Sequence, residues 1–156
     1  MKFFVYAIAA TVAIVTGQTL MSQSPIDLPV CAKPVANTGN FSIAFSTASA
    51  VVSHEGTTVR ATWSAGPHSH LTVNGNVYQS LQLHGHAPSE HTIGGKQYPF
   101  EVHVLHSDKD NNLAVVHTLS KAQLKQWSNV IHLPNAREIQ DLNGRVVTLT
   151  RAHSVC

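Results

Sequence analysis

The stretch 70–106 most strongly limits what this chain can fold into, because polar and apolar residues alternate between turn signals. The runs HLTVNGNVYQSLQLHGH (70–86) and YPFEVHVLH (98–106) show the period of two that is typical of β-strands. Asn74-Gly75 interrupts the first run and predicts a type I′ hairpin. Gly94-Gly95 predicts a second two-residue turn. The stretch therefore predicts consecutive antiparallel strands.

Further strand patterns and one helical pattern lie on either side of this stretch. FSIAFS (41–46), TTVRATW (57–63) and NGRVVTLT (143–150) also have the composition of strands. Ser120 can cap KAQLKQWSNVI (121–131), whose large apolar residues share one helical face. The chain is therefore predicted to be mainly β with one late helix.

The composition is that of one globular domain. At 156 residues, with 43% hydrophobic and 12% charged residues, the chain can bury a core and is neither disordered nor fibrous. The formal net charge is +2, and no run of Lys and Arg is dense enough to bind nucleic acid. We therefore expect no nucleic-acid partner.

The first residues have the pattern of an export signal. A basic start is followed by the 13-residue apolar run FFVYAIAATVAIV (3–15), which is short for a bilayer span and suits a signal-peptide core. We predict a signal peptide over 1–17 and a secreted mature domain over 18–156, with no stable membrane span after cleavage. An N-terminal anchor or a buried strand is the alternative. Secretion would make Cys31 and Cys156 candidates for oxidation.

Histidines gather on the two longest predicted strands. If the ladder continues unbroken from the Gly94-Gly95 turn, His86 lies directly opposite His103, and opposed residues share a face. His84 lies on that same face because side chains alternate along a strand. The pattern therefore predicts that three imidazoles converge.

Three converging histidines with an open fourth position are typical of a catalytic zinc site. Gln82 and Glu101 each stand two residues from a proposed ligand and can accept its second ring N–H. A lone His-x-His is more often a surface or core feature, but two strands that supply three histidines with partners favour a metal. His91 and His106 fall off this face, and we interpret them as structural.

Two other interpretations fit part of the pattern. His84, His86 and Glu90 also resemble the first metal motif of cupins, although the second cupin motif has no match downstream. A secreted, non-enzymatic binding module with an incidental histidine cluster is the other alternative.

Several longer segments together resemble the α-class carbonic anhydrases. They occur in the family's order along the chain: QSPIDL (23–28), LQLHGHAPSEHT (81–92), GGKQYPFEVHVLH (94–106), NNLAVV (111–116) and NAREIQDLNGR (135–145). The resemblance implies a twisted, mostly antiparallel sheet with few helices. It also implies reversible hydration of carbon dioxide to bicarbonate and a proton.

The resemblance also implies a role for each site residue. Zn²⁺ would be held by three ligands, His84, His86 and His103. Gln82 and Glu101 would be the hydrogen-bond partners behind these ligands. Glu90 would belong to the relay that orients the attacking hydroxide.

The chain departs from the family pattern at two places that matter for catalysis. Thr57 stands where the family has its proton-shuttle histidine, and His54, His68 or His70 are the candidates to replace it. After Val116 the family has a long segment that ends in Ser-Leu-Thr-Thr-Pro-Pro, and this chain lacks it.

The missing segment predicts an incomplete fold and weak activity. A non-catalytic, zinc-binding or interaction protein related to carbonic anhydrase is the alternative function. The family's usual disulfide partner is lost with the segment, so Cys31 is expected to be free or joined to Cys156.

Overall fold

A computed structural model describes the parts of the chain that form the sheet and its surroundings. The described residues are 12–15, 24–30, 41–63, 69–120 and 134–141. The strands are β1 (Val12–Val15), β2 (Asp27–Leu28), β3 (Phe41–Ala44), β4 (Ala50–Glu55), β5 (Thr58–Trp63), β6 (His70–Val73), β7 (Asn76–His86), β8 (Thr92–Ile93), β9 (Lys96–Gln97), β10 (Phe100–Ser107) and β11 (Leu113–Ser120).

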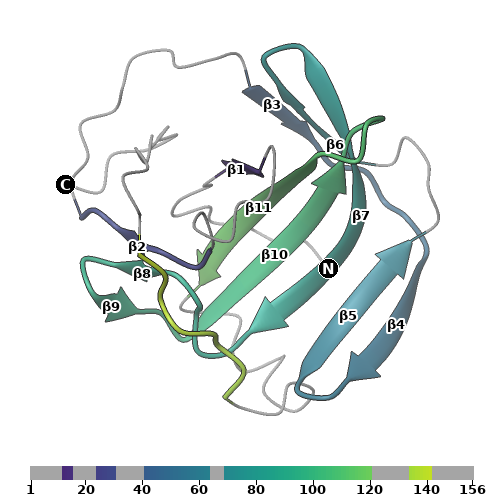
Figure 1. The fold of residues 1–156 in the computed structure, drawn as a ribbon. Coiled ribbons are helices and arrows are strands. Elements are labelled where there is room, and N and C mark those ends of the chain that lie inside the picture. The colour runs from purple at the N-terminus through teal and green to yellow at the C-terminus, as the bar shows by residue number, and fades with distance from the viewer. Residues whose placement is uncertain (1–11, 16–23, 31–40, 64–68, 121–133, 142–156) are drawn as a thin grey trace.

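Two sheets account for all of these strands. Eight strands form a curled sheet whose main path is β1-β11-β10-β7-β5-β4, with β6 paired to β7 and β3 to β6 (Figure 1). A small sheet has the order β2-β8-β9. Every pairing is antiparallel except that of β2 with β8. The prediction of a mainly β, mostly antiparallel fold is confirmed.

The Asn74-Gly75 turn forms as predicted. It joins β6 to β7, with Val73 opposite Asn76. The φ angles of Asn74 and Gly75 are 51° and 83°, both in the left-handed region that a type I′ turn requires. The turn fixes the start of β7, the strand that carries two of the predicted metal ligands.

The Gly94-Gly95 turn also forms, but the register derived from it was wrong. Ile93 pairs with Lys96 as expected, but this hairpin belongs to the small sheet. On the large sheet His103 lies opposite His84 instead of His86. The pairing of β8 with β9 does not continue into the pairing of β7 with β10. The chain leaves the large sheet after His86, and β8, which begins at Thr92, belongs to the small sheet. The offset of two residues leaves the same side chains on the same face.

The apolar core lies on the face of β10 opposite to His103. Along β10, Phe100, Val102 and Val104 alternate with the polar residues. One cluster on this face joins Val59, Ala87 and Phe100, with Val102 packed against it. A second cluster joins Leu71, Tyr78, Ala114 and Val116, with Ile43, Val73 and Val104 packed against it. The sheet thus has an apolar face and a histidine-bearing face.

Some predicted elements lie outside the described residues. These are the helix over 121–131, the strand over 143–150, and both cysteines. Ser120, predicted as the helix cap, is the last residue of β11. Within the described ranges there is no helix long and apolar enough to cross a membrane.

Strand β1 lies inside the predicted signal peptide, 1–17. The structure pairs it with β11 along Val12–Val15. The signal peptide stays a prediction, and its cleavage would remove this neighbour from β11.

Candidate metal centre

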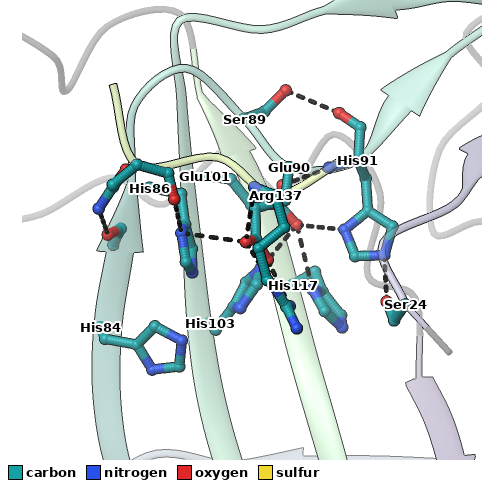
Figure 2. Close-up of polar contacts among 12 residues, drawn as sticks. Ser24, His84, His86, Ser89, Glu90, His91, Glu101, His103, His117 and Arg137 are labelled. Atoms are coloured by element: carbon teal, nitrogen blue, oxygen red, sulfur yellow. Dashed lines mark hydrogen bonds and ion pairs between the residues drawn. The ribbon is translucent and has the colours of Figure 1, made fainter. Parts of the chain in front are cut away.

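Three histidines converge on one face of the large sheet, and we call them the histidine triad. His84 and His86 come from β7 and His103 from β10 (Figure 2). Ring centroids lie 5.1 Å apart for His84 and His86, 5.0 Å for His84 and His103, and 4.6 Å for His86 and His103. One potential ligand atom from each ring lies within 4.8 Å of the other two. The structure therefore brings together the three predicted ligands.

Hydrogen bonds fix the tautomer of each triad ring. Each ring has one nitrogen beside an oxygen: His84 Nδ1 with Gln82 Oε1 at 3.0 Å, His86 Nδ1 with the backbone oxygen of Asn135 at 3.1 Å, and His103 Nε2 with Glu101 Oε1 at 2.8 Å. These oxygens only accept, so each of these ring nitrogens carries the proton and donates it. The other nitrogen of each ring is left with a lone pair.

The surroundings of the triad keep two of its imidazoles, His84 and His103, neutral. Burial, reinforced by electrostatic interactions with His86 and Arg60, lowers the pKa of His84 to about 4. Burial likewise lowers the pKa of His103 to about 3, against the opposing hydrogen bond to Glu101. A neutral imidazole is the form that donates a lone pair to a metal.

The triad fits a metal by one further observation. His86 Nε2 is buried and has no hydrogen-bond partner among the described residues. A buried polar atom without a partner costs about 1–3 kcal/mol, so a native structure usually supplies one. A metal ion bound by the three lone pairs would satisfy this atom, and three nitrogens from β-strands suit zinc.

Glu101 is the centre of a second buried group, which we call the Glu101 cluster (His91, Glu101, His103 and His117). Its Oε1 lies 2.6 Å from His91 Nδ1, 2.8 Å from His103 Nε2 and 3.1 Å from His117 Nδ1. Its Oε2 accepts the backbone N–H of His91 at 2.8 Å. Burial opposes ionisation, but these hydrogen bonds hold the pKa of Glu101 far below its usual range. The buried carboxylate is therefore charged.

Glu90, the predicted relay residue, is paired with Arg137. Arg137 Nε donates to Glu90 Oε1 at 2.7 Å, and its Nη2 donates to Oε2 at 2.7 Å. The backbone N–H of Arg137 also donates to Oε1, at 3.2 Å. Burial opposes the charge, but the hydrogen bonds and positive charge of Arg137 lower the pKa of Glu90. Glu90 thus anchors the 134–141 segment beside the triad.

We expect Arg137→Gln to destabilise the fold by about 1–3 kcal/mol at neutral pH, since it leaves the fully buried Glu90 carboxylate without its main donors. The Glu90 pKa is lowered by folding, so its contribution is present above the unfolded pKa and is lost as pH falls through the folded value. The deficit should therefore shrink below about pH 4. Urea unfolding at several pH values measures it, with Arg137→Lys as the control that keeps the charge.

A deficit that is equal at neutral and acid pH would show that Arg137 acts by packing and not through Glu90. A loss in Arg137→Lys as large as that in Arg137→Gln would show that the two-pronged geometry, and not the charge, is what matters.

Three residues of this region were not assigned a role from the sequence. Asn135 bonds His86 through its backbone oxygen, and its side chain donates to Gly85 O and accepts from the Ala87 N–H. Asn135 and Arg137 lie in a segment that resembles the family, and this resemblance could have indicated that they have a role. No such indication exists in the sequence for His117, because only the pairing of β11 with β10 places it opposite His103.

Thr57 and the other histidines singled out from the sequence are not members of the triad, although the His91 and His103 ring centroids lie 6.1 Å apart. His106 is fully buried on the apolar face, and its Nδ1 donates to the Val104 backbone oxygen at 3.0 Å. His91 touches Glu101 and belongs to the Glu101 cluster. Thr57 and His54 are exposed, His70 is half-buried on β6, and His68 lies outside the described residues.

The comparisons with known proteins agree with this geometry. The model of the eukaryotic-type carbonic anhydrase family matches residues 15–124. The chain belongs to this family. The cupin interpretation of the His84, His86 and Glu90 pattern is therefore wrong.

Plant carbonic anhydrases are among the similar curated proteins. Alpha carbonic anhydrase 6 of Arabidopsis thaliana is 35% identical over 99 residues, which are 64% of this chain and 38% of that protein. Alpha carbonic anhydrase 2 of the same species is 49% identical over 51 residues, 33% of this chain and 21% of that protein. The chain thus spans well under half the length of these relatives.

Solved carbonic anhydrases share the fold. A hyperthermostable carbonic anhydrase from a hydrothermal vent chimney is 36% identical with a TM-score of 0.58, over 74% of this chain and 52% of that one. The α-carbonic anhydrase of Thermovibrio ammonificans, solved with the inhibitor sulfanilamide, is 30% identical with a TM-score of 0.57, over 81% of this chain and 57% of that one. The common fold is the curled antiparallel sheet, which in this chain carries the histidine triad.

Proposed function

We propose that this chain binds one Zn²⁺ through the histidine triad and catalyses the reversible hydration of carbon dioxide. The observation that carries the proposal is the set of three fixed lone pairs on His84, His86 and His103, one of them on a buried nitrogen with no other partner. Family membership supports the reaction. Bound zinc would supply hydroxide at neutral pH, because it lowers the pKa of water to about 7.

The chain's own residues have two tasks in this reaction. Gln82, Asn135 and Glu101 hold the triad rings in place, so that their lone pairs are aimed before a metal arrives. Glu90 stands next to the triad, with its carboxylate 3.4 Å from His86 Nδ1. It is the candidate residue for the relay that orients the attacking hydroxide, and Arg137 donates to both of its oxygens.

Metal content tests the zinc assignment directly. We expect the double variant His84→Ala, His86→Ala to bind one zinc ion fewer per chain than the wild type, because a single remaining imidazole cannot hold the ion. Elemental analysis after equilibration with zinc and gel filtration counts the ions. His70→Ala is the matched control, since His70 lies on the same sheet outside the triad.

Equal metal content in the double variant and the wild type would refute the assignment. Sulfanilamide provides a second readout, since a solved neighbour binds it as an inhibitor. Calorimetric binding of sulfanilamide should be seen with the zinc-loaded wild type and be lost in the double variant.

A further inference from the structure

We propose that the Glu101 cluster binds a second divalent cation, of the zinc type, through His91 Nδ1, His117 Nδ1 and the Glu101 carboxylate. Two imidazoles and one carboxylate are a common zinc ligand set. This site is separate from the histidine triad and goes beyond the proposed carbonic anhydrase function.

The three proposed ligands are buried and lie close together. His91 is 3% exposed, Glu101 0% and His117 6%. Potential ligand atoms of these residues and of His103 all lie within 4.8 Å of one another. The Nδ1 atoms of His91 and His117 both lie beside Glu101 Oε1, and the two rings are edge to face with centroids 4.4 Å apart. Little rearrangement is needed to place an ion among them.

The hydrogen bonds of the Glu101 cluster are not all satisfied well by one carboxylate oxygen. Three ring nitrogens crowd on one oxygen, Glu101 Oε1, which has two lone pairs. An ion bonded to Oε1, His91 and His117 would replace two of these three contacts and leave the one from His103. Ligands around a tetrahedral zinc lie roughly 3.3 Å apart, given bonds of about 2.0–2.1 Å. The present separations of 2.6 and 3.1 Å would have to open by less than about 1 Å.

His91 can adopt the tautomer that a metal requires. Its Nε2 lies 2.8 Å from Ser24 Oγ, and a hydroxyl can either donate or accept a hydrogen bond. When His91 carries its proton on Nε2, it donates to Ser24, and Nδ1 has a free lone pair. This is the usual arrangement of a metal-binding histidine, whose second nitrogen is held by an acceptor.

Charge also favours a cation at this place. The cluster contains the buried Glu101 carboxylate, and a divalent ion bound to it would place a positive charge beside this negative group. Arg137 pairs with Glu90, whereas no Lys or Arg among the described residues forms an ion pair with Glu101. A buried charge is normally paired or bound to a metal.

The two sites would share Glu101 without competing for it. One carboxylate oxygen can accept the His103 N–H and bond a metal at once, because it has two lone pairs. His103 therefore stays with the triad.

Zinc titration of the metal-free full chain tests the second site. We expect two zinc ions per chain in the wild type and one in His117→Gln. The triad double variant His84→Ala, His86→Ala should also bind one, and the combination of all three changes none. His117→Cys should bind two, since a thiolate can replace the imidazole as a ligand. His70→Gln is the control and should keep both ions.

One zinc ion in the wild type, lost in the triad double variant and retained in His117→Gln, would overturn the second site and leave the proposed function intact. Two ions in His117→Gln would also overturn it. Should His117→Gln fail to fold by circular dichroism, the triad double variant decides: one remaining ion supports the site, and none refutes it. A triad double variant that keeps both ions would instead refute the proposed function.

Discussion

Carbon dioxide hydration by the zinc-loaded chain is expected to be on the order of 10²–10³ slower than by a full-length relative such as alpha carbonic anhydrase 6 of Arabidopsis thaliana. The segment that the resemblance places after Val116 would supply the Thr that orients the hydroxide. In this chain β11 instead continues through this point to Ser120. Both Glu90 oxygens are bonded to Arg137, and one lost preorganised contact typically costs this much in rate.

Two differences from the family would slow the reaction: the missing Thr that orients the hydroxide, and the missing proton-shuttle histidine. Stopped-flow hydration assays at increasing concentrations of imidazole buffer separate their effects. Added buffer should raise the rate, because Thr57 stands where the family has its proton shuttle, and exposed Thr57 cannot carry a proton at neutral pH. Thr57→His should reduce the dependence on buffer without restoring the full rate. A rate equal to that of the relative, and insensitive to buffer, would mean that neither defect matters.

Replacing the carboxylate that holds His103 should have the second large effect. We expect Glu101→Gln to weaken zinc binding at the histidine triad by about 10–100-fold, the usual cost of losing a partner behind a metal ligand. The amide turns one of its ends into a donor, so it cannot accept from His103, His117 and the His91 backbone together. The hydrogen bond from His103 also loses its charge assistance.

The measurement is a zinc competition titration against a chromogenic chelator in the His117→Gln background, where only the triad ion is counted. Gln82→Ala is the matched comparison, because Gln82 holds His84 through a neutral acceptor. Its loss should be smaller, about 3–10-fold, as a neutral hydrogen bond contributes about 0.5–1.5 kcal/mol. Equal losses in the two variants would show that the charge of Glu101 is unimportant for the triad.

Local sequence signals predicted the strands and the shared face of the ligands well. Asn-Gly and Gly-Gly turns and the period of two depend on neighbours within a few residues, so they are readable without a structure. The face of His84, His86 and His103 followed from this period even though the register was wrong by two. Gln82 and Glu101 were found for the same reason, since each stands two residues from a ligand.

Contacts between distant segments were decided by the tertiary structure alone. The exit of the chain from β7 after His86 moved the Gly94-Gly95 hairpin into another sheet, which set His103 opposite His84. Asn135 and His86 are 49 residues apart in the sequence, so no local sequence pattern could predict their hydrogen bond.

The sequence by itself determined that this protein is mainly β with three imidazoles on one face, because alternation and turn chemistry are local. Only the tertiary structure decided what surrounds those imidazoles. His117 joins Glu101 because β11 pairs with β10 in one register, and Arg137 reaches Glu90 because the 134–141 segment returns to the sheet. Burial and charge at the site arise from these long-range pairings, which bring together residues that the sequence keeps apart.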